Sequence, residues 1–197
     1  YGVRFEYDSP MSAKRTYGFR LSYGKGDNYS PGLDWLSKFS VNYGLYPTDN
    51  LNIDFKYSHE DEAQWLNWIS ENKLATFDKK QRRTNVSLKW FKANKHELRV
   101  KAQMVAFTAR KPKPYLATFN GKLIKSNHQV SPFTLSELAF QVRYRYEIMP
   151  LAYFYLVYTK GGRVYEEDEE DDLGKIYKRP WEDPTSDTFT IKVRYKF

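Results

Sequence analysis

The chain has 197 residues, of which 5 are Trp, 17 Tyr and 13 Phe, yet 28% of its residues are charged and its mean hydropathy is −0.77. These values exclude a helical membrane protein, which needs about 20 consecutive apolar residues per span, and a disordered chain, which would be poor in aromatic residues. The chain has no cysteine, which excludes a disulfide framework and a thiolate zinc site. Its first residue is Tyr1 and no secretory-signal pattern follows, so we expect a processed or partial chain.

The formal net charge is +8, although residues 166–172 form one uninterrupted acidic run. The rest of the chain is therefore strongly basic, which first suggests nucleic acid or an anionic surface as a partner. Proteins that bind single strands place stacking aromatic and basic side chains on one exposed surface. In this chain the two kinds alternate along the sequence and fall on opposite faces, so no nucleic-acid partner is expected.

Alternation of apolar and polar residues, the pattern of a half-buried strand, recurs along the whole chain. Near the C-terminus, for example, Phe189 and Ile191 alternate with Thr190 and Lys192. No segment predicts a long amphipathic helix, and residues 65–72 are expected to form at most a helical turn or two inside a loop. The nine predicted strands lie, in chain order, near residues 1–8, 15–25, 36–46, 50–60, 82–91, 96–109, 134–148, 151–160 and 187–197.

The links between these strands alternate in length. Short links made of polar or turn-forming residues lie at 9–12, 47–49, 93–95 and 149–150. Longer links join the other strand ends, at 25–35, 61–81, 110–133 and 161–186. Tight turns on one side and long loops on the other are typical of a transmembrane β-barrel, whose long loops face outside. The sequence therefore predicts an all-β fold, an antiparallel up-and-down transmembrane β-barrel.

The orientation of the two faces decides between a membrane barrel and a soluble barrel of lipocalin type, which would point its apolar face inward. Aromatic residues cluster near strand ends on the apolar face, as they do at the two boundaries of a bilayer. The strands also have about the 9–11 residues that cross a bilayer with tilt. Turning the basic face outward would place each Arg or Lys in hydrocarbon at about 2–4 kcal/mol near the midplane. We therefore expect a lumen lined by Arg4, Arg20, Lys56, Arg83, Lys89, Arg99, Lys101, Arg143, Arg145, Lys192 and Arg194.

A basic lumen has two interpretations at this stage. It would favour anions, as rings of charge do in pores, or receive an acidic plug or partner protein. Alternatively, these residues pair with one another, with acidic residues of further strands and with water. The sequence leaves both interpretations open.

The C-terminal strand has a pattern that is similar to one in a known class of proteins. Its alternating apolar residues and its aromatic end resemble the C-terminal recognition strand of bacterial outer-membrane barrels, through Phe189, Ile191, Val193, Tyr195 and Phe197. The resemblance implies the Gram-negative outer membrane as location, the bilayer and lipopolysaccharide as surroundings, and the barrel-assembly machinery as a partner that reads this strand.

A second resemblance covers most of the chain. Residues 65–69, 97–101, 140–147 and 155–162 are similar to the barrel part of an uncharacterised outer-membrane family. In that family a β-sandwich similar to carbohydrate-binding modules of family nine precedes the barrel, and no such sandwich is visible here. The resemblance implies that the whole chain, residues 1–197, is one barrel segment whose N-terminal strands and periplasmic domain are absent.

The number of strands leads to the same expectation. If the last strand runs toward the periplasm, then counting back makes the first strand run inward too. A bacterial barrel normally starts with an outward strand and closes with an even number of strands. We therefore expect the nine strands to be the C-terminal portion of a larger barrel, completed by other residues or another chain.

Three further groups of residues are candidates for function. The acidic run 166–172 has the ligand type of a calcium site but not its spacing, and a solvated outer loop is the preferred interpretation. Trp65 and Trp68 are candidates for glycan contact, although an interfacial anchor or a loop core explains them equally well. Residues 59–62 combine His, Glu and Asp, but consecutive residues on a strand point in different directions, so no metal site is expected.

Catalysis would need a nucleophile or water activated by a histidine and an orienting group. His59 and His128 lie in predicted outer loops, but no Ser–His spacing is compelling, and we assign no catalytic residue and no cofactor. The sequence thus predicts an outer-membrane barrel for passage or binding of a solute or polymer. An outer-membrane hydrolase and a structural or partner-holding barrel remain as alternatives.

Overall fold

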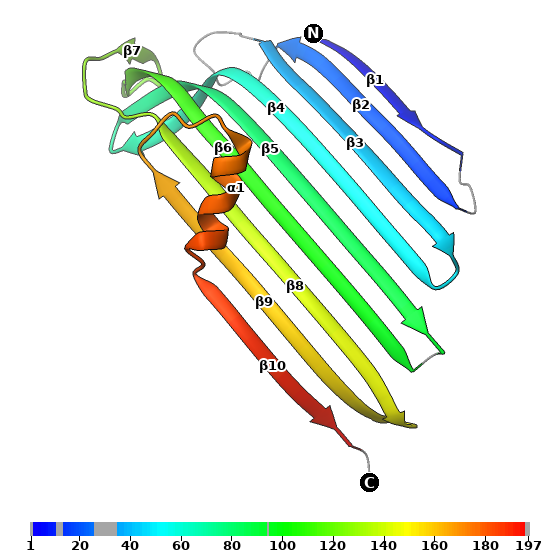
Figure 1. The fold of residues 1–197 in the computed structure, drawn as a ribbon. Coiled ribbons are helices and arrows are strands. Elements are labelled where there is room, and N and C mark those ends of the chain that lie inside the picture. The colour runs from blue at the N-terminus through cyan, green and yellow to red at the C-terminus, as the bar shows by residue number, and fades with distance from the viewer. Residues whose placement is uncertain (1, 11–13, 26–34, 94, 196–197) are drawn as a thin grey trace.

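The computed structural model describes residues 2–10, 14–25, 35–93 and 95–195. Strands hold 76% of the described residues, and these strands form a single sheet with one short helix beside it (Figure 1). The elements are β1 (Gly2–Asp8), β2 (Arg15–Lys25), β3 (Trp35–Thr48), β4 (Leu51–Ser70), β5 (Lys73–Lys92), β6 (His96–Ala117), β7 (Leu123–Lys125), β8 (Phe133–Met149), β9 (Ala152–Glu166), α1 (Leu173–Glu182) and β10 (Ser186–Arg194).

The sheet is antiparallel, and its strands follow one another in chain order. The path runs from β1 to β6 and on through β8 and β9 to β10, while the short β7 pairs only with β6. The prediction of an all-β, antiparallel, up-and-down fold is therefore confirmed. The sheet is not closed, because β1 and β10 lie at its two edges (Figure 1).

Successive short turns are staggered along the strands. β8 ends at Met149, but His96, the first residue of β6, pairs with Tyr146. The turn between β5 and β6 is offset from the turn between β3 and β4 in the same direction, because β5 continues to Lys92 whereas Leu51, the first residue of β4, pairs with Trp90. Closing a sheet into a barrel requires a stagger of this kind, which tilts the strands by about 35–45° to the barrel axis.

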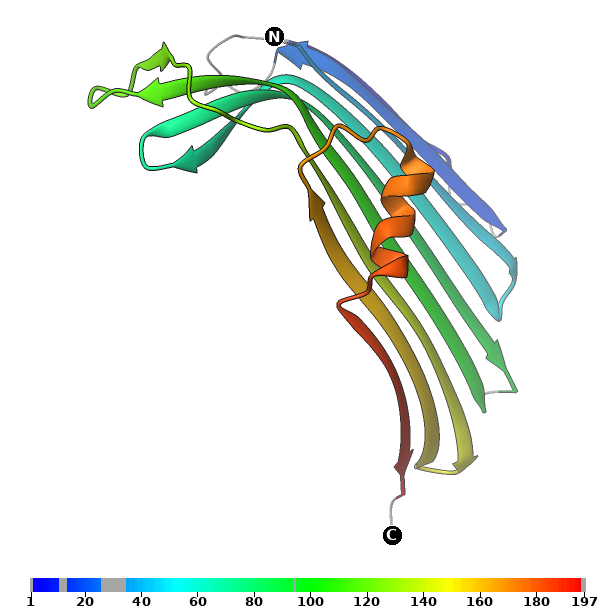
Figure 2. The ribbon, with the colours of Figure 1, turned by 60° about the vertical axis from the view of Figure 1, so that its left-hand side comes forward.

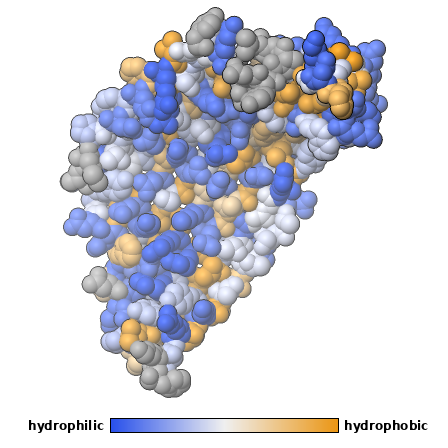
Figure 3. Space-filling model, turned by 180° about the vertical axis from the view of Figure 1, so that it is seen from behind, coloured by the Kyte–Doolittle hydropathy of each residue, from blue (hydrophilic) through white to orange (hydrophobic). Residues whose placement is uncertain are grey.

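The register puts the eleven basic residues expected in the lumen on one face of the sheet. Lys89 pairs with Arg99, and Arg99 pairs with Arg143; directly paired residues share a face. Hydrophilic residues predominate on this polar face, which Figure 3 shows from the side opposite α1. The opposite, apolar face carries the residues of the other parity, including Val100 and Val142, which pair with each other.

Two regions differ from the sequence prediction. Residues 65–72, expected to form a helical turn in a loop, belong mostly to β4, and 61–81 is a continuous extension of the β4–β5 hairpin. Residues 110–133 contain the end of β6 and the additional strand β7. The outer links are thus largely sheet, because strand pairing extends beyond the alternating segments.

The extended hairpins bend away from the main sheet and enclose a small core (Figure 2). Pairing of β4 with β5 is interrupted between Glu62 and Trp65, where Gln64 has a φ of 56°. A bulge of this kind sharpens the local bend of a strand. The core consists of Ala75, Phe77 and Ala109, packed against Trp65, Ile69, Phe107, Val130 and Phe133.

Helix α1 was not predicted from the sequence. It begins after Asp172, whose side chain accepts a hydrogen bond from the Gly174 amide at 2.8 Å and so satisfies one of the free donors of the first turn. Ile176 and Pro180 are its buried residues. Among the described residues, no helix has both the length and the apolar character to cross a bilayer.

The helix packs on the apolar face. The Tyr177 hydroxyl lies 3.2 Å from Thr84 Oγ1, and the Trp181 ring contacts Phe140 with the ring centroids 5.4 Å apart. Gly162 is required beneath it, because a Cβ there would lie 2.7 Å from the Pro180 carbonyl oxygen. Residues 161–186 therefore fold back on the sheet, rather than forming only a polar loop that reaches outward.

Candidate functional site

The polar face is hollowed along the middle of the sheet. Two hollows, of about 690 and 710 Å³, adjoin each other and share Lys56, Asn85 and Gln103 in their lining. Arg83 lines one hollow and Lys101 lines the other. These five side chains come from three neighbouring strands, β4, β5 and β6, and they face the same side because directly paired positions do so.

Some of the eleven basic residues have carboxylate partners. Glu6 accepts from Arg4 at 2.8 Å and also pairs with Arg20. Lys38, a further cation of this face, pairs with Glu60 at 3.0 Å. The outer end of the polar face is therefore partly neutralised by its own acidic residues.

One buried carboxylate gathers three arginines near the short turns. Glu97 is 2% exposed. Its carboxylate pairs with Arg99 Nε, lies 3.0 Å from Arg145 Nε and lies 3.8 Å from an Arg143 guanidinium nitrogen. The guanidinium of Arg145 also stacks on the Tyr153 ring, 5.3 Å from its centroid. A guanidinium has five donors, so a single carboxylate leaves much of the hydrogen-bonding capacity of these arginines unused.

The other six cations of the predicted set have no ion pair within the described residues. They are Lys56, Arg83, Lys89, Lys101, Lys192 and Arg194. Lys89 lies beside two arginines that already share Glu97, since it pairs directly with Arg99. Lys89, Lys101, Lys192 and Arg194 lie in the inner half of the polar face, which thus carries an excess of positive charge that the described residues do not balance.

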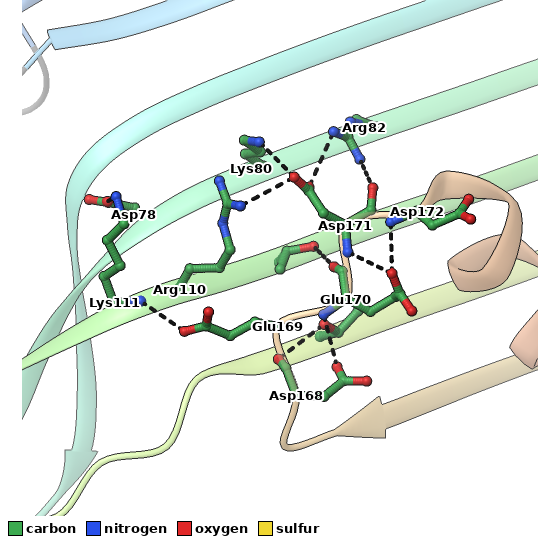
Figure 4. A network of polar contacts seen from close by, with 12 residues as sticks. Asp78, Lys80, Arg82, Arg110, Lys111, Asp168, Glu169, Glu170, Asp171 and Asp172 are labelled. Atoms are coloured by element: carbon green, nitrogen blue, oxygen red, sulfur yellow. Dashed lines mark hydrogen bonds and ion pairs between the residues drawn. The ribbon is translucent and has the colours of Figure 1, made fainter.

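The acidic run has partners, contrary to the expectation of a solvated loop. Asp171 accepts hydrogen bonds from Lys80 at 2.9 Å, Arg110 at 3.2 Å and Arg82 at 3.3 Å (Figure 4). The hydrogen bond from Lys80 lowers the pKa of Asp171; partial burial opposes this effect, and the charges of Arg110 and Arg82 add to it. Asp168 pairs in turn with Arg179 of α1 at 2.5 Å.

Trp65 and Trp68 do not form one glycan-binding platform. Trp65 packs in the small core against Phe77 and Phe107. Trp68 is 64% exposed, and its indole donates to the Glu71 carbonyl at 2.9 Å. Only Trp68 therefore offers a free ring face to a ligand.

The histidines and the metal candidates give no catalytic arrangement. His128 Nδ1 lies 3.1 Å from Ser126 Oγ, and His59 lies on β4 rather than in a loop. Within the described residues, no hydrogen bond joins either histidine ring to a carboxylate that could orient it. Over residues 2–10, 14–25, 35–93 and 95–195, no group of three or more His, Asp or Glu has a metal-binding arrangement.

The predicted recognition strand is β10, an edge strand. Phe189, Ile191 and Val193 are exposed on the apolar face, and Tyr195 follows the end of the strand. Phe197 lies outside the described residues. These side chains are exposed both because they lie on the apolar face and because β10 has a neighbouring strand on one side only.

Two functional features were missed in the sequence. Glu97 was not identified as the acidic centre of an arginine cluster. It lies two residues before Arg99, so the alternation of the strand did place it on the polar face. Asp171 was treated as one member of a charge run, and no local signal shows that its partners lie 61 to 91 positions away in the chain.

Comparison with known proteins gives no assignment, because no family model, curated protein or solved structure matches this chain. The resemblance to outer-membrane barrels therefore stays a prediction.

Proposed function

We propose that this chain is the C-terminal part of an antiparallel β-barrel in a Gram-negative outer membrane, and that its polar face lines a passage or binding site for anionic solutes. In this proposal the apolar face contacts lipid, the ends near lipopolysaccharide carry the long hairpins and α1, and β10 is read by the barrel-assembly machinery. The single observation that carries the proposal is the separation of the two faces by strand register.

The apolar face is exposed where a water-soluble protein would cover it. Phe189 is 64% exposed, Ile191 60% and Val193 61%, and the exposure continues across the sheet to Phe5 and Val3 at the other edge. Contiguous apolar surface of this kind marks an interaction with a membrane or another protein. Lipid is favoured because the exposed large apolar residues of this face come from six strands, β1 to β5 and β10, rather than from one patch.

A charged pair on the apolar face marks the upper limit of the proposed hydrocarbon band. Lys160 pairs with Asp187 at 3.4 Å, in the row that also contains Phe140. The next row on this face, Val142, Tyr158 and Phe189, carries no charge. Helix α1 rests on and above the charged row, with Lys160 Nζ 4.9 Å from the Trp181 ring centroid. A tryptophan at this level suits the boundary between water and lipid.

The directions of the edge strands limit how the barrel can close. β1 and β10 run the same way, because an even number of antiparallel pairings separates them. A second copy in the same orientation has edges that run in this same direction, so it would pair with them only in parallel. An antiparallel barrel instead needs an odd number of further strands, supplied by other residues of the protein or by a different chain. Closure would satisfy edge backbone groups, each of which costs several kcal/mol if unpaired in lipid.

The hydrolase alternative is less favoured, because within the described residues His128 contacts the Ser126 hydroxyl but neither His128 nor His59 is hydrogen-bonded to an orienting carboxylate. Passage is tested by planar-bilayer recording with the full-length protein. We expect steady current whose reversal potential in a salt gradient shows anion selectivity, as a basic lumen favours. A sealed or cation-selective barrel would contradict the proposal.

A further inference from the structure

The inner half of the polar face contains a row of three cations on adjacent strands, Lys89 on β5, Arg99 on β6 and Arg143 on β8. We infer that this row, the cation row, is a binding subsite for small multivalent oxygen anions, such as tricarboxylates or oligophosphates. The inference rests on the proposed function, since it takes the polar face to be open to solutes, and it names the class of solute.

The pairing of these residues is unfavourable without a bound anion. Like charges directly opposite each other destabilise a sheet, and here Arg99 faces Lys89 on one side and Arg143 on the other. Lys101 lies two residues after Arg99 on β6, and Arg145 lies two residues after Arg143 on β8, on the same face. Lys192 and Arg194 continue the same face on β10, where they pair with Tyr155 and Tyr153. The positive charge therefore comes from four strands, β5, β6, β8 and β10.

The acidic residues of the same region do not balance it. Glu97 is shared by three guanidinium groups. Asp54 lies on the adjoining strand β4, and it accepts hydrogen bonds from Tyr46 at 3.1 Å and Ser87 at 3.3 Å. Glu147 lies one position beyond the arginine cluster on this face and has no ion pair within the described residues. Seven cations thus meet three carboxylates.

Glu97, which is buried, orients the arginine side chains before a ligand binds. It is 2% exposed, whereas the side chains of Arg99 and Arg143 are each 38% exposed. Both guanidinium groups lie beside the Glu97 carboxylate, and their partial exposure leaves donors accessible to a ligand on the polar face. Arg143 is held most loosely, at 3.8 Å from the carboxylate. An arginine held by one acid and open to a second is already oriented, so less side-chain entropy is lost on binding.

The spacing of the row selects a multivalent ligand. Neighbouring strands lie about 4.8 Å apart, so the outer two cations of the row are separated by about 10 Å. One monovalent anion would reach at most two of them. Citrate and tripolyphosphate carry several negative oxygen groups over a comparable length, and phosphate and carboxylate oxygens both accept paired hydrogen bonds from arginine.

The test is calorimetric titration of the full-length protein in detergent with citrate and, separately, tripolyphosphate, and with acetate as the monovalent reference. Lys89→Gln and Arg143→Gln each remove one charge from the cation row. Lys38→Gln is the matched control, because Lys38 is a cation of the same face that is already paired with Glu60. Circular dichroism and thermal melting show that each variant is folded.

We expect saturable binding of citrate or tripolyphosphate, and the tighter of the two identifies the source of the oxygen anions. Lys89→Gln and Arg143→Gln should each weaken it at least tenfold, whereas Lys38→Gln should change it less than twofold. Absence of saturable binding by the wild type, or an equal loss in Lys38→Gln, overturns the subsite. Anion-selective current without such binding overturns the subsite alone, while binding by a barrel that carries no current supports the subsite and overturns passage.

Discussion

At the scale of residues, single carboxylates organise distant parts of this chain. Asp171 joins the acidic run to Lys80 and Arg82 of β5 and to Arg110 of β6. Glu97 does the same for arginines of β6 and β8. In both places the acid is shared by three cations, so its loss leaves several like charges close together.

The anchoring of the acidic run should depend on pH through Asp171. Its pKa is lowered in the folded protein, first by the Lys80 hydrogen bond, so folding favours the ionised form. The stabilisation is complete above the ordinary value of 3.8 and is lost as pH falls below 3.8 through the lowered pKa. We expect hydrogen-exchange protection of residues 166–172, corrected for intrinsic rates, to fall over this range.

Asp171→Asn should lower that protection at pH 6 by about fivefold, or about 1 kcal/mol, a value reduced for solvent screening because the Asp171 side chain is 38% exposed. Glu167→Gln is the control, since it removes one charge from the same run at a residue with no ion pair within the described chain. Equal protection of the wild type at pH 3 and pH 6 would show that Asp171 does not anchor the run.

At the scale of elements, α1 is held by packing rather than by its own helical stability. It has only 10 residues, and isolated helices of this length are marginal in water. Ile176 is fully buried against the sheet, and Arg179 ties the helix to Glu166 at 2.9 Å. The contacts of α1 with β6, β8 and β9 decide its position.

Ile176→Ala should release α1 while leaving the sheet intact. Shortening a buried isoleucine costs about 2–4 kcal/mol, and this loss falls on the helix because the strand ladder does not depend on it. The measurement is chymotrypsin cleavage at Tyr177 and Trp181, which we expect to accelerate at least tenfold. Lys178→Ala, at an exposed helix position, should leave cleavage within twofold of the wild type; equal acceleration in both variants would contradict the packing argument.

At the scale of the whole molecule, the register of one sheet separates two chemically different faces, of which Figure 3 shows the polar one. The staggered turns give it the geometry that closure requires, and its two edges run in the same direction. The acidic run 166–172 and α1 cover only the outer part of the apolar face. The remaining apolar surface is the part that the proposal assigns to lipid.

Because the chain lacks cysteine, single cysteines report the surroundings of each face directly. In outer-membrane vesicles, Gln141→Cys and Gln103→Cys should react with a water-soluble maleimide at least tenfold faster than Val142→Cys and Met104→Cys. The four positions form two pairs of neighbours on β8 and β6 whose side chains point to opposite faces. Equal rates within each pair would remove the membrane assignment.

The sequence alone determined the strands and their two faces, because a period of two is a local property that each segment carries by itself. It also indicated the short turns, through local turn chemistry, and it placed eleven basic residues on one side. The tertiary structure alone decided where α1 packs, which cations Asp171 and Glu97 hold, and that Trp65 and Trp68 separate. These features depend on how several strands are aligned across the sheet and on contacts between residues far apart in the chain, and no local pattern encodes either.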